Sequence, residues 1–135
     1  MVDLPSTSDR TTVIGATGTG KTMFSVWLLS TRDWYKRRWF VLDFKGEQLF
    51  RDIDLTPMDI GADLPDEPDV YHISILPGED DKVSQFFMKC FMAGNCGIYI
   101  DEGYGLPYQD RWVRACLTMG RSKNIEIICC TQRPV

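Results

Sequence analysis

Residues 15–22 have types and spacing that are typical of a phosphate-binding loop. They read Gly-Ala-Thr-Gly-Thr-Gly-Lys-Thr, which matches the pattern G-x-x-x-x-G-K-[ST] at every fixed position. Glycines let the backbone fold around phosphates, and the amides that begin the following helix face the anion. A lysine can reach the β- and γ-phosphates, and a threonine hydroxyl can bind Mg²⁺. The predicted nucleoside-triphosphate site consists of Gly15, Ala16, Thr17, Gly18, Thr19, Gly20, Lys21 and Thr22.

Two carboxylates, Asp101 and Glu102, directly follow the apolar run Ile-Tyr-Ile. A strand that ends in aspartate places this carboxylate at the carboxyl edge of the sheet, where it can hold Mg²⁺ through water. The neighbouring glutamate can then polarise an attacking water, as triphosphate hydrolysis requires. The alternative interpretation is an acidic pair in an ordinary loop after a strand. Beside a phosphate loop, the hydrolytic interpretation is favoured.

Gln132 follows the last apolar run, in the string Thr-Gln-Arg-Pro. A glutamine at the end of a strand near the phosphate loop can sense the γ-phosphate by hydrogen bonding and couple hydrolysis to movement. A plain turn before Pro134 is the alternative.

The elements that must position these residues alternate along the chain. Apolar runs predict strands at residues 11–14, 38–43, 70–76, 97–101 and 125–131. Helical periodicity predicts helices at residues 20–30, 80–93 and 108–119. The proline-containing segment 52–69 is predicted to be irregular. This alternation predicts a three-layer α/β fold with a mainly parallel central sheet of about five strands.

Length and composition set further limits. A chain of 135 residues fits one domain, which we expect to span residues 11–135 after a polar segment at residues 1–10. No apolar run approaches the roughly 20 residues that span a bilayer. The 5 cysteines and the lone His72 lack the spacing of a zinc site, which favours buried, reduced thiols and a cytoplasmic location.

Charge is unevenly distributed along the chain. Segment 52–69 contains seven acidic residues and no basic residue, so removing it from a net charge of −4 leaves +3. Segment 32–39 is basic and contains three aromatic residues. Such a segment can contact nucleic acid through phosphates and bases. It can equally be a basic turn that core tryptophans anchor, and both interpretations stay open from sequence.

Together, these motifs resemble the HerA/FtsK superfamily of translocating ATPases. The matching strings are the phosphate loop, Val-Leu-Asp-Phe-Lys-Gly-Glu at 41–47, Ile-Tyr-Ile-Asp-Glu at 98–102, and Met-Gly-Arg at 119–121 before Thr-Gln-Arg-Pro. The small size most resembles the genome-packaging ATPases of membrane-containing icosahedral viruses. The resemblance covers about residues 11–135 and implies a RecA/ASCE-like P-loop NTPase fold.

The resemblance also implies roles and partners. It implies a motor that hydrolyses ATP with Mg²⁺, with Lys21 and Glu102 in catalysis, Thr22 and Asp101 as metal ligands, and Gln132 as γ-phosphate sensor. Arg121 matches the position of an arginine finger that reaches a neighbour's site, with Arg114 as an alternative. The implied assembly is a homo-oligomeric ring, expected to be a hexamer, that moves double-stranded DNA at a capsid or membrane vertex. The implied location is the host cytoplasm or the virion.

Several alternatives remain open at this point. A Zot-like phage assembly or secretion ATPase shares the phosphate loop, as does a small P-loop kinase. Lys45 can approach phosphates or DNA, or it can be a plain surface lysine. Superfamily members continue past Thr-Gln-x-Pro with a further strand and helix, so we expect the elements that cover the last strand either outside this chain or from a neighbouring subunit.

Overall fold

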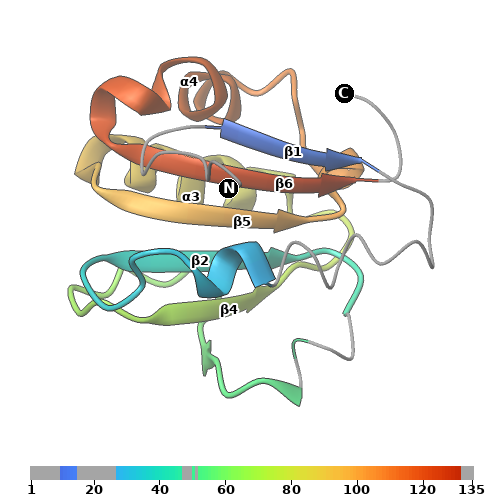
Figure 1. Cartoon of the computed structure of the whole chain (residues 1–135). Helices are drawn as coiled ribbons and strands as arrows, with labels where there is room; N and C mark the ends of the chain where they lie inside the picture. Colours follow the sequence, from blue (N-terminus) through green and yellow to red (C-terminus); the bar gives the residue numbers. More distant parts are fainter. Residues whose placement is uncertain (1–9, 15–26, 47–49, 51, 132–135) are drawn as a thin grey trace.

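One parallel sheet forms the middle of the molecule. The computed structural model describes residues 10–14, 27–46, 50 and 52–131. The strands are β1 (Arg10–Ile14), β2 (Arg38–Asp43), β3 (Thr56–Pro57), β4 (Val70–Ser74), β5 (Cys96–Asp101) and β6 (Ile125–Thr131). They form a 6-stranded sheet in the order β1-β6-β5-β2-β4-β3, with every pairing parallel. The labelled arrows in Figure 1 accordingly all point the same way. The predicted α/β class is confirmed.

The strand count is one higher than predicted. The additional strand, β3, has only 2 residues and lies in segment 52–69, which the sequence predicts to be irregular. It pairs with β4 at the edge of the sheet, and the Met58 amide donates to the His72 carbonyl at 2.9 Å. Pro57 has no amide hydrogen, which an edge strand tolerates. A two-residue strand has no periodicity, so the sequence pattern could not reveal it.

Helices cover both faces of the sheet and make it the middle of three layers. On one face lie α3 (Asp80–Ala93) and α4 (Arg111–Met119), which pack against each other (Figure 1). Phe40, Ile98 and Ile127 point into this layer, together with the buried α3 residue Phe86. The alternate strand residues Trp39, Val41, Tyr99 and Ile128 face the other side, where they pack with Leu28 and Leu29 of the helical residues 27–30. This alternation is the period-2 pattern of strands buried on both faces.

Most element boundaries match the sequence prediction, and the start of α4 is the main exception. The sequence predicts a helix from residue 108, but α4 begins at Arg111 after a 3₁₀ turn, η1 (Gly103–Gly105). Asp110 is the N-cap, and its carboxylate accepts hydrogen bonds from the Trp112 and Val113 amides at 3.0 Å. Capping by an aspartate fixes the first turn there. Strand β4 also ends at Ser74 rather than at residue 76.

The basic segment 32–39 is largely structural. The guanidinium groups of Arg32 and Arg37 are buried, and both pair with the fully buried Glu126 at 2.6 and 3.3 Å. Trp39 is fully buried and donates to Asp33 at 3.1 Å. Two of the basic groups therefore cannot contact phosphates without disrupting the core. This favours the anchored basic turn over the nucleic-acid interpretation.

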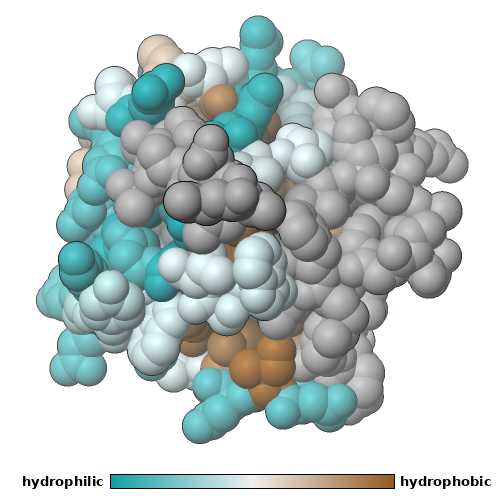
Figure 2. All heavy atoms as spheres, viewed as in Figure 1, coloured by the Kyte–Doolittle hydropathy of each residue, from teal (hydrophilic) through white to brown (hydrophobic). Residues whose placement is uncertain are grey.

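The described surface is mostly hydrophilic on the face drawn in Figure 2, with a small hydrophobic group on the side where β4 lies. All 5 cysteines are free and buried, as predicted. Among the described residues, no helix has the length and apolarity needed to cross a bilayer.

Candidate functional site

The carboxyl ends of the central strands lie side by side at one edge of the sheet. β6 lies between β1 and β5, and the register pairs Ile14 with Thr131 and Asp101 with Cys130. The predicted phosphate loop, residues 15–22, follows β1, and the predicted sensor Gln132 follows β6; both lie outside the described residues. Strand β6 ends beside Asp101, and β1 ends on the other side of β6 at the same edge of the sheet.

Asp101 is the last residue of β5 and is only 2% exposed. On the neighbouring strand β2, the residue in register with Asp101 is Asp43, which is equally buried. Because Asp101 is the last residue of a strand that is buried on both faces, its carboxylate lies at the carboxyl edge of the sheet. Mg²⁺ takes oxygen ligands, keeps several waters, and uses one or two carboxylates together with substrate phosphates. The buried Asp101 carboxylate at this edge suits the ion as a ligand, and Thr22, the other predicted ligand, lies outside the described residues.

Glu102 adopts a left-handed backbone conformation, with φ 59° and ψ 67°. This conformation is uncommon for a residue with a side chain, and such outliers cluster at functional sites. The Gly105 amide donates to the Glu102 carbonyl at 3.0 Å, which closes the η1 turn. The following Gly103 is required for packing, since a Cβ there would lie 2.1 Å from the Cys129 sulfur. The chain therefore makes a sharp turn immediately after Asp101.

A second set of residues reaches the same edge from β2 and β4. The Lys45 ammonium lies 3.1 Å from a Glu102 carboxylate oxygen. Asp43 lies 2.8 Å from His72 Nε2 and accepts from the Lys45 and Gly46 amides. A cavity of about 290 Å³ opens here, and its lining includes Lys45 and Glu102. The contact with Lys45 thus links Glu102, which follows β5, to the end of the neighbouring strand β2.

The Asp43–His72 contact is a part of the site that the sequence did not predict. From sequence, His72 is considered only as a metal ligand, and Asp43 only as part of a motif. The two residues lie on different strands whose adjacency no local pattern reveals. A signal that could find them is a polar side chain within an otherwise mainly apolar strand: Asp43 is the last residue of β2, and His72 is the middle residue of β4.

Arg121 lies away from this edge. It belongs to η2 (Gly120–Lys123), directly before β6, so it lies at the amino edge of the parallel sheet. It is exposed and lines a hollow of about 310 Å³ together with Arg10 and Thr118. Arg114, the alternative finger, is also exposed. Within one chain, the structure does not bring either arginine to Asp101 and Glu102, so their roles stay predictions.

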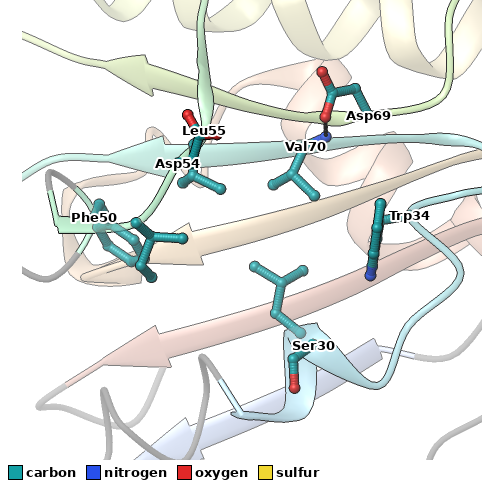
Figure 3. A pocket seen from close by; sticks show the side chains of 9 residues that line it. Ser30, Trp34, Phe50, Asp54, Leu55, Asp69 and Val70 are labelled. Atoms are coloured by element: carbon teal, nitrogen blue, oxygen red, sulfur yellow. Dashed lines mark hydrogen bonds between the residues drawn. The ribbon is translucent and has the colours of Figure 1, made fainter.

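Another cavity, of about 230 Å³, lies between the helical residues 27–30 and β4. Figure 3 shows Phe50, Leu55 and Val70 around it, with Trp34 on the side opposite Phe50. Its lining is mainly apolar, and it includes neither Asp101 nor Glu102. The carboxylate pair therefore identifies the sheet edge, rather than this cavity, as the candidate site.

Comparisons with known proteins identify relatives of this chain in sequence and in fold. No protein-family model matches the chain. The chain is 39% identical over 136 residues to the DNA packaging ATPase P9 of Enterobacteria phage PRD1. This match covers 99% of the chain. The chain spans 60% of the length of that relative.

Solved structures show the same fold. The genome packaging NTPase B204 of Sulfolobus turreted icosahedral virus 2, in complex with ATP-gammaS, matches with a TM-score of 0.65 at 16% identity, over 96% of this chain and 68% of that one. B204 from Sulfolobus turreted icosahedral virus, a DNA-packaging ATPase, matches with a TM-score of 0.59 at 16% identity, over 93% of this chain and 66% of that one. The predicted resemblance to viral genome-packaging ATPases is therefore confirmed: this chain shares the fold of B204 and is related in sequence to a phage DNA packaging ATPase.

Proposed function

We propose that this chain is the ATPase core of a viral genome-packaging motor, which hydrolyses ATP and moves double-stranded DNA. The observation that carries the proposal is the Asp101–Glu102 pair at the carboxyl end of β5, which only β6 separates from β1, the strand that leads into the phosphate-loop string. The similarity to a phage packaging ATPase over 99% of this chain supports the same function. A packaging motor works where capsids are filled, so the proposal includes a location in the host cytoplasm or at the virion.

In this proposal, residues 15–22 bind the phosphates, and Lys21 contacts the β- and γ-phosphates. Thr22 and Asp101 hold Mg²⁺, which neutralises charge on the phosphates when it is bound. Glu102 accepts a hydrogen bond from the attacking water and orients it toward the γ-phosphate. Gln132 hydrogen-bonds the γ-phosphate and passes its loss to β6.

The proposal includes a homo-oligomeric ring, expected to be a hexamer. Arg121 lies at the edge of the sheet opposite to Asp101, which supports a role in a neighbour's site rather than in its own. Head-to-tail contacts of this kind close into rings. An arginine supplied in trans contributes about 10³–10⁵ to the rate of related phosphoryl transfers.

The first test measures ATP hydrolysis by the purified protein with and without double-stranded DNA. We expect DNA-stimulated hydrolysis that Glu102→Gln abolishes. The matched control is Glu67→Gln, the same substitution at an exposed residue away from the site. Equal hydrolysis by Glu102→Gln and wild type would refute the assignment, and γ-phosphate transfer to a nucleoside would favour a kinase instead.

The second test mixes two inactive variants, Glu102→Gln and Arg121→Ala. If sites form between subunits, mixed rings contain some sites with both Glu102 and Arg121 intact, so activity returns on mixing. Arg114→Ala is the matched comparison because it lies on the neighbouring α4 and is also exposed. Failure to recover activity in rings shown to be mixed would place Arg121 outside the trans site.

A further inference from the structure

The Lys45–Glu102 ion pair connects two strand ends at the candidate site. The Nζ–Oε2 distance is 3.1 Å, and the side chains are 33% and 15% exposed. Lys45 follows β2 and Glu102 follows β5, two strands that pair in parallel and end in register at Asp43 and Asp101. The pair thus joins a lysine of no assigned role to the proposed water-orienting carboxylate.

The backbone that carries Lys45 is fixed by buried groups. One Asp43 oxygen accepts from the Lys45 amide at 3.2 Å and from the Gly46 amide at 2.7 Å. The other Asp43 oxygen lies 2.8 Å from His72 Nε2 on β4. Gly46 has φ +69°, a conformation that suits glycine in such a turn. Because Asp43 is only 2% exposed, the hydrogen bonds that hold this turn are made by a buried side chain.

Glu102 needs a cationic partner because its carboxylate is poorly solvated. Its side chain is only 15% exposed, and desolvation disfavours a charge that is neither paired nor hydrogen-bonded. Its backbone is held in the left-handed region by the η1 turn, so the side chain leaves the strand in one direction. Removing the ammonium would let the carboxylate rotate toward water. This rotation would move it from the position that orients the attacking water.

We propose that Lys45 is a positioning residue that holds the Glu102 carboxylate in its working orientation, and that Asp43 and His72 hold the turn that presents Lys45. This inference rests on the proposed function, in which Glu102 orients water. A lysine that contacted the triphosphate directly would act on nucleotide affinity. A positioning lysine acts on kcat and leaves the affinity unchanged.

The experiment compares Lys45→Met, Lys45→Arg and wild type for kcat, for KM and for the Kd of a non-hydrolysable ATP analogue. We expect Lys45→Met to lower kcat about tenfold or more, since small displacements of a catalytic group have effects of this size. KM and Kd stay within about twofold. Lys45→Arg keeps a cation beside Glu102 and recovers most of kcat, whereas a packing role for the stem would not separate Met from Arg.

Lys82→Met is the matched control. Lys82 forms an ion pair with Glu79 at 3.2 Å, similar in length but outside the strand ends that carry Asp101 and Glu102. We expect its kcat to equal that of wild type. Unchanged or higher kcat in Lys45→Met would overturn the inference, as would a loss matched by an equal weakening of analogue binding.

A melting-temperature cycle tests the contact without any hydrolysis. It uses wild type, Lys45→Met, Glu102→Gln and the double variant. If the two side chains interact, the shift of the double variant differs from the sum of the single shifts. Additive shifts would overturn the pairing even if the protein hydrolyses no ATP. Conversely, an active wild type with an inactive Glu102→Gln and a normal Lys45→Met would leave the proposed function standing and remove Lys45 from it.

Discussion

Replacing Glu126 with glutamine should strongly destabilise the fold. Glu126 is fully buried on β6, and its two oxygens lie 2.6 Å from Arg32 Nη1 and 3.3 Å from Arg37 Nη2. Burial raises the pKa of the Glu126 carboxyl, although hydrogen bonding to Arg32 and the charges of Arg32 and Arg37 act to lower it. The cluster thus carries a desolvation cost, which the pairing among its three groups offsets together with the contacts of Arg37 to the Asp33 carboxylate at 3.0 Å and to the Asn124 carbonyl at 2.7 Å.

The expected magnitude follows from what the substitution leaves behind. Glutamine has nearly the same shape, but it removes the anion and leaves the guanidinium groups of Arg32 and Arg37 without it. Breaking a buried ion pair from one side costs about 3–5 kcal/mol. That is a large part of the about 5–15 kcal/mol by which native proteins are stable. At about 3–4 °C per kcal/mol for a chain of this size, the melting temperature should fall by roughly 10–20 °C.

The assay is thermal unfolding followed by circular dichroism, with Glu67→Gln as the exposed control. The control should melt within about 2 °C of wild type, because exposed substitutions change stability little. A triple variant in which leucine or methionine replaces Arg32, Arg37 and Glu126 should melt above Glu126→Gln, since it removes the three buried charges together and leaves only the part-exposed Asp33 carboxylate without its Arg37 partner. A Glu126→Gln protein that melts like wild type would refute the reasoning and reopen a surface role for the two arginines.

Three further predictions concern stability and reactivity. Burial acts to raise the pKa of Asp110, but hydrogen bonds from Ser84 and from the α4 amides lower it overall. Asp110→Ala should therefore lower the free energy of unfolding by about 1 kcal/mol near neutral pH. That difference, measured by urea unfolding, should shrink as the pH falls and wild type loses its carboxylate cap. Gly97→Ala should unfold in less urea or fail to fold, because its Cβ would lie 2.2 Å from the buried Trp39 ring. All 5 cysteines are buried, and burial raises the pKa of Cys116 to about 12. Because none of the thiols is accessible, a thiol reagent should modify none of them until the protein is unfolded.

The sequence predicted the layered fold because the buried strands are long apolar runs and α3 has a clear stripe. The predicted helix 80–93 and the strands 38–43 and 125–131 agree with the structure residue for residue. The errors fall where periodicity is absent or where capping decides, as at β3 and at Asp110. The acidic segment 52–69 contains Gly, Pro and Asp signals, and these correctly favour turns but hide a two-residue edge strand.

The candidate site divides in the same way. Local order along the chain placed Asp101 and Glu102 at the end of an apolar strand, and parallel strands put such ends at one edge. The sequence could therefore identify the carboxylates and propose what they bind. It could not identify Lys45 as the partner of Glu102, nor His72 as the partner of Asp43, because each contact joins different strands.

By itself, the sequence predicted the chemistry of this protein, since the phosphate-loop string and the acidic strand end are each encoded in consecutive residues. Only the tertiary structure decided which charges face that chemistry and which face the core. Arg32 and Arg37 are basic residues that folding buries against Glu126, whereas Lys45 reaches the carboxylate of Glu102. The physical reason is strand order, because a sheet brings together residues that are far apart in the chain, and no local pattern specifies that order.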